Sequence, residues 1–345
     1  MKQFNLCFLG FGNVGRALAA LLVRKREELR EQYGIEWRVT GVATRRAGWL
    51  IAREGFETSE LSSGEISPGE ISPHSLPPPS NVSEWLEAAR CDVLFETTSL
   101  EPLAGEPAIS HVRAGLRAGA HVVTANKGTI VHAYRELSEL ASEVGRRFLF
   151  EATVSDCPVF SLFREALPCA RLLGFGGVLN STTNIILEEI ETGGTFDEGV
   201  RRAQDLGVTE TDPAHDVDGW DSAVKICAVV NVLMNARLKL EDVRRAGIRD
   251  LSIEEVRAAR AEGQPYRLVA RAHREGEGGS VTASVGPERI DASSPFALAA
   301  GTSLVVHFEL DVLPGLTLIA HRPDLQSTAY GLLADFINIV KEGKQ

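Results

Sequence analysis

The segment from Gly207 to Lys225 holds the densest group of side chains suited to chemistry in this chain. Its five carboxylates belong to Glu210, Asp212, Asp216, Asp218 and Asp221. Such a cluster favours recognition of an ammonium group or another cation, although no spacing within it fixes a metal site. Asp221 and Lys225 are four residues apart, which places both side chains on one face of a helix. Lys225 precedes an apolar run and is suited to proton transfer, with an ordinary ion pair as the alternative.

A glycine-rich turn near the N-terminus is the second candidate site. It consists of Gly10, Phe11, Gly12, Asn13, Val14 and Gly15. Glycine at the first, third and sixth positions supplies a tight turn, an open approach for a phosphate group and close contact between helix and strand. The turn joins an apolar segment to an amphipathic one, which predicts a dinucleotide site. The alternative is a glycine turn of some other α/β fold.

The end of the second predicted strand bears on which nicotinamide cofactor binds. Enzymes that use NAD usually place a carboxylate there for the ribose 2′-hydroxyl. This chain has Thr44, Arg45 and Arg46 instead, with no acidic residue among them. Guanidinium groups bind phosphate in a bidentate manner, so the pair suits a ribose 2′-phosphate. We therefore predict NADP(H) in preference to NAD(H). The alternative is that both arginines are solvated surface charges.

Two further polar groups follow predicted strands. Thr97, Thr98 and Ser99 come directly after an apolar strand, and Lys127 follows the next one. In a doubly wound sheet the carboxyl ends of such strands border the cofactor crevice. The hydroxyl groups are suited to the ribose or nicotinamide side, and Lys127 is suited to bind a substrate carboxylate or to transfer a proton. A capping turn and a surface lysine are the respective alternatives.

Alternating strands and helices must position these groups. We predict strands at 4–9, 37–43, 92–96, 121–124 and 147–151, and helices at 16–32, 83–89, 107–118 and 133–144. This order is typical of a doubly wound, Rossmann-type α/β domain. Residues 62–80, rich in Pro, Ser and Gly, form a predicted loop.

The pattern changes after Glu151. We expect strands at 174–179, 267–274, 280–286 and 304–310, and helices at 183–191, 196–206, 221–234 and 328–341. This order predicts a second α/β (α+β) domain built on a mixed sheet.

Composition narrows the class of protein further. With 345 residues the chain is long enough for two domains. Its net charge of −11 argues against a nucleic-acid-binding protein, which needs a basic face. The 5 cysteines are scattered and indicate neither a disulfide framework nor a zinc ribbon. The first residues do not have the pattern of a signal peptide and no long apolar run occurs, so we expect a cytoplasmic protein without a membrane partner.

The order and spacing of these segments resemble homoserine dehydrogenase over nearly the whole chain. The resemblance rests on the turn from Gly10 to Gly15 and on the acidic segment. It also rests on the stretches Thr124–Gly128, Glu151–Val154 and Gly177–Asn184. It implies a nucleotide-binding domain at 1–132, a catalytic and dimerisation domain at 133–310, and a segment at 311–345 that returns to the first domain. A homodimer without a C-terminal ACT regulatory module is expected.

The resemblance also implies an activity and residue roles. Family members reversibly reduce L-aspartate 4-semialdehyde to L-homoserine, on the route to threonine and methionine. Lys225 matches the proton donor, Asp221 its paired carboxylate, and Lys127 the lysine beside the nicotinamide. Glu210 matches the acid that holds the substrate amino group, with Asp216 as a neighbouring carboxylate. The implied roles extend to two loop residues against the substrate, Ser181 and Thr182, and to an alkali cation (Na⁺ or K⁺) at Glu151 and Val154.

Two departures from the family pattern keep alternatives open. The loop Ser155–Pro158 is one residue shorter than expected and lacks a glycine, which calls the cation site into question. Val208 replaces an aromatic residue. The alternatives are an NADP-dependent dehydrogenase for another amino-acid-derived aldehyde or alcohol, and a non-catalytic NADP-binding homologue. Cys157 is weighed as a nucleophile, but we expect a small, partly buried thiol.

Overall fold

The structure is a computed structural model that describes residues 1–63, 79–209, 212–276 and 278–342. The chain divides into two compact units. The first unit comprises Met1–Thr153 and Leu325–Gln345, and the second comprises Val154–Asp324. The sequence analysis sets its boundaries at 132 and 310 instead. The first unit continues to Thr153 because the helix and strand that follow residue 126 pack onto and extend its sheet. The predicted α/β class with a second mixed sheet is confirmed.

The sheet of the first unit has six strands in the order β3-β2-β1-β4-β5-β6. They are β1 (Lys2–Leu9), β2 (Ile35–Thr44), β3 (Gly48–Ile51), β4 (Val93–Glu96), β5 (His121–Thr124) and β6 (Phe148–Leu149). Neighbouring strands are parallel except β3, which runs antiparallel to β2. β2 and β3 follow β1 on one side of the sheet, and β4, β5 and β6 follow on the other. The topological switch point therefore lies between β1 and β4, at their carboxyl ends.

Seven helices belong to the described part of this unit. They are α1 (Asn13–Arg24), α2 (Arg26–Tyr33), α3 (Thr58–Ser63), α4 (Val82–Ala88), α5 (Ala108–Arg117), α6 (Lys127–Glu143) and α13 (Leu325–Glu342). The prediction of one helix at 16–32 is wrong, because Lys25 departs from helical geometry with φ −98° and ψ 10° and separates α1 from α2. The helix expected at 133–144 begins earlier, because the Asn126 side chain caps it by accepting the Gly128 N–H.

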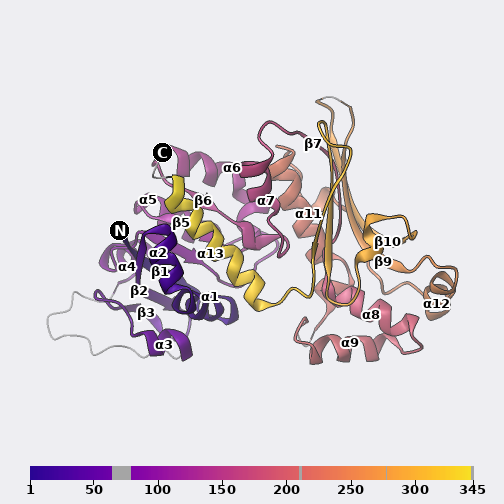
Figure 1. The fold of residues 1–345 in the computed structure, drawn as a ribbon, viewed down its shortest axis with the longest axis horizontal. Helices are drawn as coiled ribbons and strands as arrows, with labels where there is room; N and C mark the ends of the chain where they lie inside the picture. Colours follow the sequence, from indigo (N-terminus) through magenta and orange to yellow (C-terminus); the bar gives the residue numbers. More distant parts are fainter. Residues whose placement is uncertain (64–78, 210–211, 277, 343–345) are drawn as a thin grey trace. The chain divides into compact units, whose positions relative to one another are not determined.

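The C-terminal helix α13 contributes to the core of the first unit (Figure 1). It packs against α1, and its Phe336 ring lies 5.6 Å from that of Phe4 and 6.0 Å from that of Phe95, edge to face. All three rings are nearly inaccessible to solvent. Burial of a phenylalanine side chain in this way contributes about 1.5–3 kcal/mol to stability.

The second unit is built on another six-stranded sheet, in the order β12-β11-β7-β9-β10-β8. The strands are β7 (Leu172–Val178), β8 (Arg244–Arg245), β9 (Tyr266–Arg274), β10 (Val281–Arg289), β11 (Leu304–Leu310) and β12 (Leu316–Ala320). All pairs are antiparallel except β8 with β10. The predicted strands at 174–179, 267–274, 280–286 and 304–310 are confirmed, whereas β8 and β12 are short edge strands that the sequence pattern does not predict.

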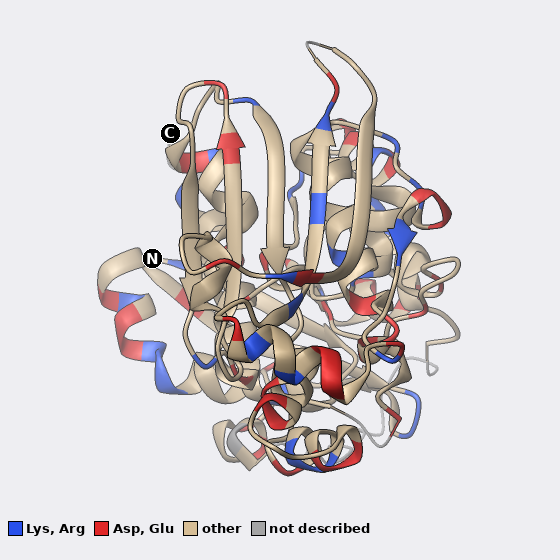
Figure 2. Ribbon diagram, turned by 90° about the vertical axis from the view of Figure 1, so that its right-hand side faces the viewer, with Lys and Arg blue, Asp and Glu red and all other residues tan. Residues whose placement is uncertain are grey.

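Helices of the second unit pack mainly through α8 (Ser181–Glu191) and α11 (Trp220–Leu233), which contact β9. The other described helices are α7 (Val159–Ser161), a π-helical turn (Leu162–Ala166), α9 (Phe196–Asp205), α10 (Ala214–Val217), α12 (Ile253–Ala261) and two 3₁₀ turns, Leu240–Asp242 and Pro295–Leu298. Figure 2 looks onto the sheet face that α11 leaves uncovered, where most of the strand residues are uncharged. Among the described residues, no helix combines the length and apolar character needed to cross a bilayer.

Candidate active site

The glycine turn of the first unit has the geometry of a phosphate site. Gly10 adopts φ +90°, and a Cβ there would lie 2.6 Å from the Thr97 carbonyl group. Gly15 is similarly confined, whereas a Cβ at Gly12 would meet no heavy atom within 4 Å. Gly12 is also the N-cap residue of α1 and supplies no side-chain cap to the first N–H groups of the helix. The turn therefore fits a pyrophosphate at a helix N-terminus.

The remaining residues of the turn divide between core and surface. Phe11 is buried, and its ring packs edge to face against Phe8 at 5.5 Å. Val14 is half-buried against the same core, and Asn13 is exposed. Phe11 and Val14 hold the turn in place through packing, and the backbone around Gly12 is what remains open to a ligand.

The hairpin between β2 and β3 carries the predicted basic pair. Arg45 and Arg46 are both exposed there, beyond Thr44, whose hydroxyl accepts the Ala47 N–H at 2.9 Å. The hairpin adjoins the glycine turn, because the Gly10 N–H donates to the Ala43 carbonyl at 2.9 Å. The two guanidinium groups thus stand on the strand next to the glycine turn, and the described hairpin offers no carboxylate to a ribose 2′-hydroxyl.

A buried carboxylate organises the loops after β4 and β5. Glu96 is inaccessible to solvent and accepts hydrogen bonds from the Thr98 N–H and hydroxyl and, at 2.9 Å, from the Thr124 hydroxyl. The Thr97 hydroxyl donates to the Gly10 carbonyl at 2.8 Å. Both predicted threonine hydroxyls are therefore engaged within the framework, while Ser99 is exposed. Sequence analysis missed Glu96 as an organising residue, although a carboxylate inside an apolar strand is a usable signal.

Lys127 is the first residue of α6 and is half-buried. Asn126, which precedes it, donates to the carbonyl groups of Thr98 at 3.3 Å and Ser99 at 3.2 Å. These bonds tie the loop after β4 to the start of α6. Lys127 therefore stands at the carboxyl edge of the sheet that also carries the glycine turn.

In the second unit, Lys225 and Asp221 form the close pair that their spacing predicts. The Lys225 ammonium lies 2.6 Å from the Asp221 carboxylate and donates to the Leu179 carbonyl, also at 2.6 Å. Their side chains are only 13% and 19% exposed, so the pair is not a solvated surface bridge. Because α11 supplies both residues and the loop after β7 supplies the carbonyl, two elements hold the ammonium in one position.

Asn180 joins this pair to a second carboxylate. Its side-chain amide donates to Asp216 at 2.6 Å and to Asp221 at 3.1 Å. Thr209 donates to the other oxygen of Asp216 at 3.0 Å. Burial and the nearby Asp221 raise the pKa of Asp216, while the bonds from Asn180 and Thr209 and the charge of Lys225 act in the opposite direction.

The other residues of the second unit that the sequence analysis singles out have different hydrogen-bond partners from Asp216 and Asp221. Ser181 and Thr182 begin α8, and their hydroxyls donate to the carbonyls of Thr302 at 2.8 Å and Val208 at 3.1 Å. Asp218 pairs with Arg249 at 2.5 Å, away from the Asp216–Asp221 pair. Glu210 lies outside the described residues. Of the five carboxylates, the structure thus shows two brought together by Asn180.

The segment proposed for an alkali cation begins with a short 3₁₀ turn, Glu151–Thr153, where a strand end was expected. The Glu151 N–H donates to Asp335 of α13 at 2.7 Å. Glu151 and Val154 are both buried, and the division between the two units falls just before Val154. Cys157 is a buried thiol, as expected. Within the described part of the chain, no cluster of three His, Cys, Asp or Glu side chains is placed to hold a metal.

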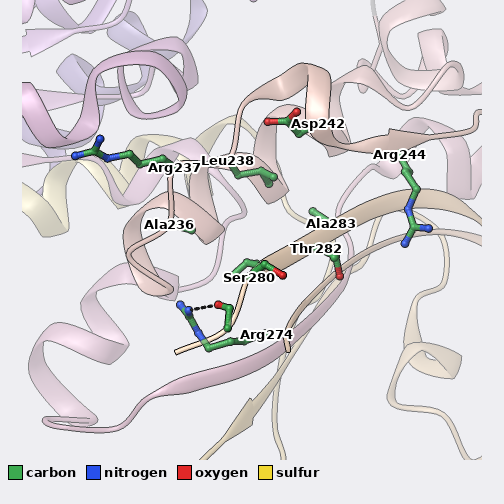
Figure 3. A pocket seen from close by; sticks show the side chains of 11 residues that line it. Ala236, Arg237, Leu238, Asp242, Arg244, Arg274, Ser280, Thr282 and Ala283 are labelled. Atoms are coloured by element: carbon green, nitrogen blue, oxygen red, sulfur yellow. Dashed lines mark hydrogen bonds between the residues drawn. The ribbon is translucent and has the colours of Figure 1, made fainter. Parts of the chain in front are cut away.

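A cavity of about 500 Å³ lies elsewhere in the second unit (Figure 3). It is bordered by the Ala236–Leu238 segment and by the turn between β9 and β10. Arg274 donates to the Gly279 carbonyl at 3.0 Å, while the Arg237 and Arg244 side chains point away from one another. No predicted site residue lines this cavity, so we assign it no part in the chemistry.

Comparisons with known sequences agree with the motifs. A family model described as "Homoserine dehydrogenase" matches residues 158–337, and one described as "Homoserine dehydrogenase, NAD binding domain" matches residues 10–151. The chain is 34% identical to an NAD(+)-dependent homoserine dehydrogenase of Pseudomonas canavaninivorans, over 98% of this chain and 97% of the relative. It is 30% identical to a homoserine dehydrogenase of Methanocaldococcus jannaschii, over 99% of this chain and 100% of the relative.

Solved structures of homoserine dehydrogenases have a similar fold. A putative homoserine dehydrogenase from Archaeoglobus fulgidus has a TM-score of 0.83 at 29% identity, with 99% of each chain covered. A hyperthermophilic archaeal homoserine dehydrogenase mutant in complex with NADPH has a TM-score of 0.80 at 26% identity. That match covers 99% of this chain and 98% of the archaeal one.

Proposed function

The chain belongs to the homoserine dehydrogenase family, and from this premise we propose that it interconverts L-aspartate 4-semialdehyde and L-homoserine with NADP(H) as preferred cofactor. It is an NAD(P)-dependent oxidoreductase of this family, and the matches favour this function over another aldehyde substrate or a non-catalytic homologue. The observation that carries the residue assignments is the Lys225 ammonium, held between the Asp221 carboxylate and the Leu179 carbonyl.

The nicotinamide, when bound, supplies the hydride that adds to the aldehyde carbon. Lys225 donates a proton to the carbonyl oxygen as that oxygen becomes an alkoxide. Asp221 and the Leu179 carbonyl hold the ammonium in one orientation. In the reverse direction the uncharged amine accepts the proton of the homoserine hydroxyl. The chain's own contribution is orientation, charge and proton transfer.

Charge in the second unit supports recognition of the substrate's α-ammonium. Asp216 and Asp221 contribute −2 and Lys225 contributes +1, which leaves −1 for an incoming cation. We assign the ammonium to Asp216 together with Glu210, and the α-carboxylate to Lys127. Ser181 and Thr182, at the start of α8, are assigned to the wall of the substrate site.

The preference for NADP(H) rests on the β2–β3 hairpin. Arg45 and Arg46 are exposed there, beside the strand that leads into the glycine turn, and no carboxylate ends β2. We assign the adenosine ribose phosphate to these arginines, the pyrophosphate to the backbone around Gly12, and the nicotinamide side to the loops that carry Thr97, Ser99 and Lys127.

Further features of the proposal concern the whole protein. We assign nucleotide binding to the first unit, to which α13 returns, and catalysis and dimerisation to the second unit. Leu298, Val312 and Leu313 are 57%, 63% and 41% exposed, which supports burial of this region in a homodimer. We also propose a Na⁺ or K⁺ site at the Glu151–Val154 segment, and a cytoplasmic role in threonine and methionine biosynthesis.

A panel of alcohols oxidised with NADP⁺ or NAD⁺ tests this function. L-Homoserine is compared with 4-hydroxybutyrate, which lacks the ammonium, and with 3-aminopropan-1-ol, which lacks the carboxylate. We expect homoserine with NADP⁺ to give the highest kcat/KM, and 4-hydroxybutyrate to lose about 10⁴-fold, because it lacks the ammonium that balances the remaining negative charge of the site. Equal kcat/KM for homoserine and 4-hydroxybutyrate would overturn the assignment of the ammonium, and faster turnover with NAD⁺ would overturn the cofactor preference.

A further inference from the structure

We infer that Asn180 is a positioning residue for the proposed reaction, which acts by holding two carboxylates of the site side by side. The inference rests on the proposed function and concerns a residue of the Gly177–Asn184 stretch to which the resemblance assigns no role. Asn180 is 4% exposed and follows β7, in the loop that leads into α8. It contacts Asp216 of α10 and Asp221 of α11, so one side chain joins three elements.

The orientation of the Asn180 amide is fixed by its own oxygen. That oxygen accepts the Thr183 N–H at 2.9 Å and so caps α8. The amide nitrogen must therefore face the carboxylates, where it has two hydrogens for two acceptors. Its bonds to Asp216 at 2.6 Å and to Asp221 at 3.1 Å use both hydrogens. No other uncharged side chain that can form a helix cap offers this combination of length and donors.

The bridge has an electrostatic consequence. Two carboxylates this close repel each other, which raises the pKa of one of them. The hydrogen bond from the neutral Asn180 amide acts in the opposite direction. The charged groups that act on Asp216 in the described structure are Asp221 and Lys225, and its polar partners are Asn180 and Thr209. The hydrogen bond from Asn180 therefore lowers the pKa of Asp216, against the effects of burial and Asp221, while it leaves Asp221 aligned with Lys225.

The backbone couples the same residue to the proton donor. Lys225 donates to the carbonyl of Leu179, the residue that directly precedes Asn180. The cap on α8 and the bridge to the carboxylates thus fix the loop from which that carbonyl projects. A change at Asn180 affects both carboxylates directly and the Lys225 ammonium through Leu179.

Two substitutions separate the bridge from the helix cap. Asn180→Asp keeps the shape and the capping oxygen but replaces the donor by a third carboxylate. Asn180→Ser keeps a good cap and is too short to reach the carboxylates. Asn81→Asp is the matched control, because Asn81 caps α4 by accepting the Glu84 N–H at 3.0 Å and lies in the other unit.

We expect Asn180→Asp to lower kcat/KM for homoserine about tenfold at neutral pH and to move the acidic limb of its pH profile upward by about one unit. Asn180→Ser shifts the limb in the same direction by less. The KM for NADP⁺ changes little in both, Asn180→Asp lowers the Tm because it buries a third carboxylate, and Asn81→Asp leaves the profile unchanged. Should Asn180→Asp not fold, Asn180→Ser supplies the same test. A loss of kcat with lowered Tm and no movement of the acidic limb overturns the inference.

A readout independent of turnover separates this inference from the proposed function. The carboxyl carbon of Asp216, labelled with ¹³C and identified by its loss in Asp216→Asn, is titrated by NMR. We expect the pKa of Asp216 to rise in Asn180→Asp and Asn180→Ser. An unchanged titration overturns the bridging role even in an active enzyme. Failure of the unsubstituted chain to oxidise homoserine overturns the proposed function and leaves the titration to decide on Asn180.

Discussion

Proton transfer in this account depends on how firmly one side chain is held. Lys225 sits between a carboxylate and a carbonyl at 2.6 Å each, and it is 13% exposed. A long lysine side chain loses substantial rotational freedom when it is fixed in this way. The structure offsets that cost with two charge-assisted contacts, which orient the ammonium before any substrate binds.

Replacing Lys225 by Met is expected to remove the proton donor and keep most of the packing. We predict that kcat for aspartate semialdehyde reduction falls about 10²–10⁴-fold, the usual contribution of a positioned acid, while NADPH affinity is unchanged. Steady-state kinetics and fluorescence titration of NADPH measure the two effects. Lys239→Met, at a 72% exposed lysine paired with Glu241, is the control. If Lys225→Met retained full kcat, Lys225 would have no role as the acid.

Asp216 is expected to cost stability at neutral pH. Burial and Asp221 raise its pKa in the folded chain. The folded state thus binds the proton more tightly than the unfolded state, and stability falls as pH rises from the ordinary aspartate pKa to the raised value. Asp216→Asn should raise the Tm at pH 7 by about 2–4 °C for each kcal/mol that it adds to the free energy of unfolding. It should also raise the KM for homoserine.

The gain in Tm should vanish near about pH 3, where an ordinary aspartate with a pKa of about 3.9 is largely protonated in both states. Thermal unfolding of both proteins over the pH range measures this. A Tm difference that is independent of pH, or a lower Tm for Asp216→Asn at neutral pH, would contradict the account.

At the scale of elements, we propose that the carboxyl ends of β1 and β4 and the start of α1 form one phosphate site. Gly10 is required by the fold, since a Cβ there would lie 2.6 Å from the Thr97 backbone, and Gly15 is confined less tightly, with the Gly10 carbonyl oxygen at 3.0 Å. Gly12 is different, because its surroundings in the structure are open. The three glycines of one motif therefore serve two purposes, which substitution can separate.

Gly12→Ala is predicted to leave the Tm nearly unchanged and to weaken NADPH binding by about tenfold or more, because the methyl group occupies space that a pyrophosphate needs. Gly10→Ala should instead destabilise the first unit by at least about 1–2 kcal/mol, owing to its φ of +90° and the 2.6 Å approach to Thr97. Thermal unfolding and NADPH titration distinguish the two. Tight binding by Gly12→Ala would remove the turn from the cofactor site.

Much of this arrangement was predictable from local sequence pattern. Hydrophobic periodicity predicts β1, β4, β5, β7, β9 and β11, as well as α8, α9, α11 and α13 within a few residues. Hydrophobic periodicity fails where a helix boundary depends on the conformation or the capping bond of one residue. The break at Lys25 and the early start of α6 at Asn126 depend on single-residue backbone geometry and capping, which periodicity does not report.

In the candidate active site, too, local contacts were predictable from the sequence and long-range contacts were not. The spacing of Asp221 and Lys225 predicts their ion pair, because both belong to one helix turn. Asn180 lies 36 residues from Asp216 and 41 from Asp221, so its bridge depends on tertiary packing. Glu96 organises Thr124 in the same non-local way. Neither residue carries a motif that would identify its partners from sequence.

For the whole molecule, a net charge of −11 conceals opposite local charges. The β2–β3 hairpin presents two arginines, and the Asp216–Asp221–Lys225 group carries −1 in a partly buried setting. One suits the phosphate of a cofactor and the other suits the ammonium of an amino-acid substrate. A chain that binds both partners needs this separation of charge, and net charge alone does not reveal it.

Identification of the reaction product tests the central claim most directly. The purified chain is incubated with NADPH and L-aspartate 4-semialdehyde in phosphate-free buffer containing Na⁺ or K⁺. Cofactor oxidation is followed by absorbance, and the product is identified by mass spectrometry. The account predicts one homoserine formed for each NADPH consumed. No consumption of NADPH across neutral and mildly alkaline pH, or a product other than homoserine, would contradict it.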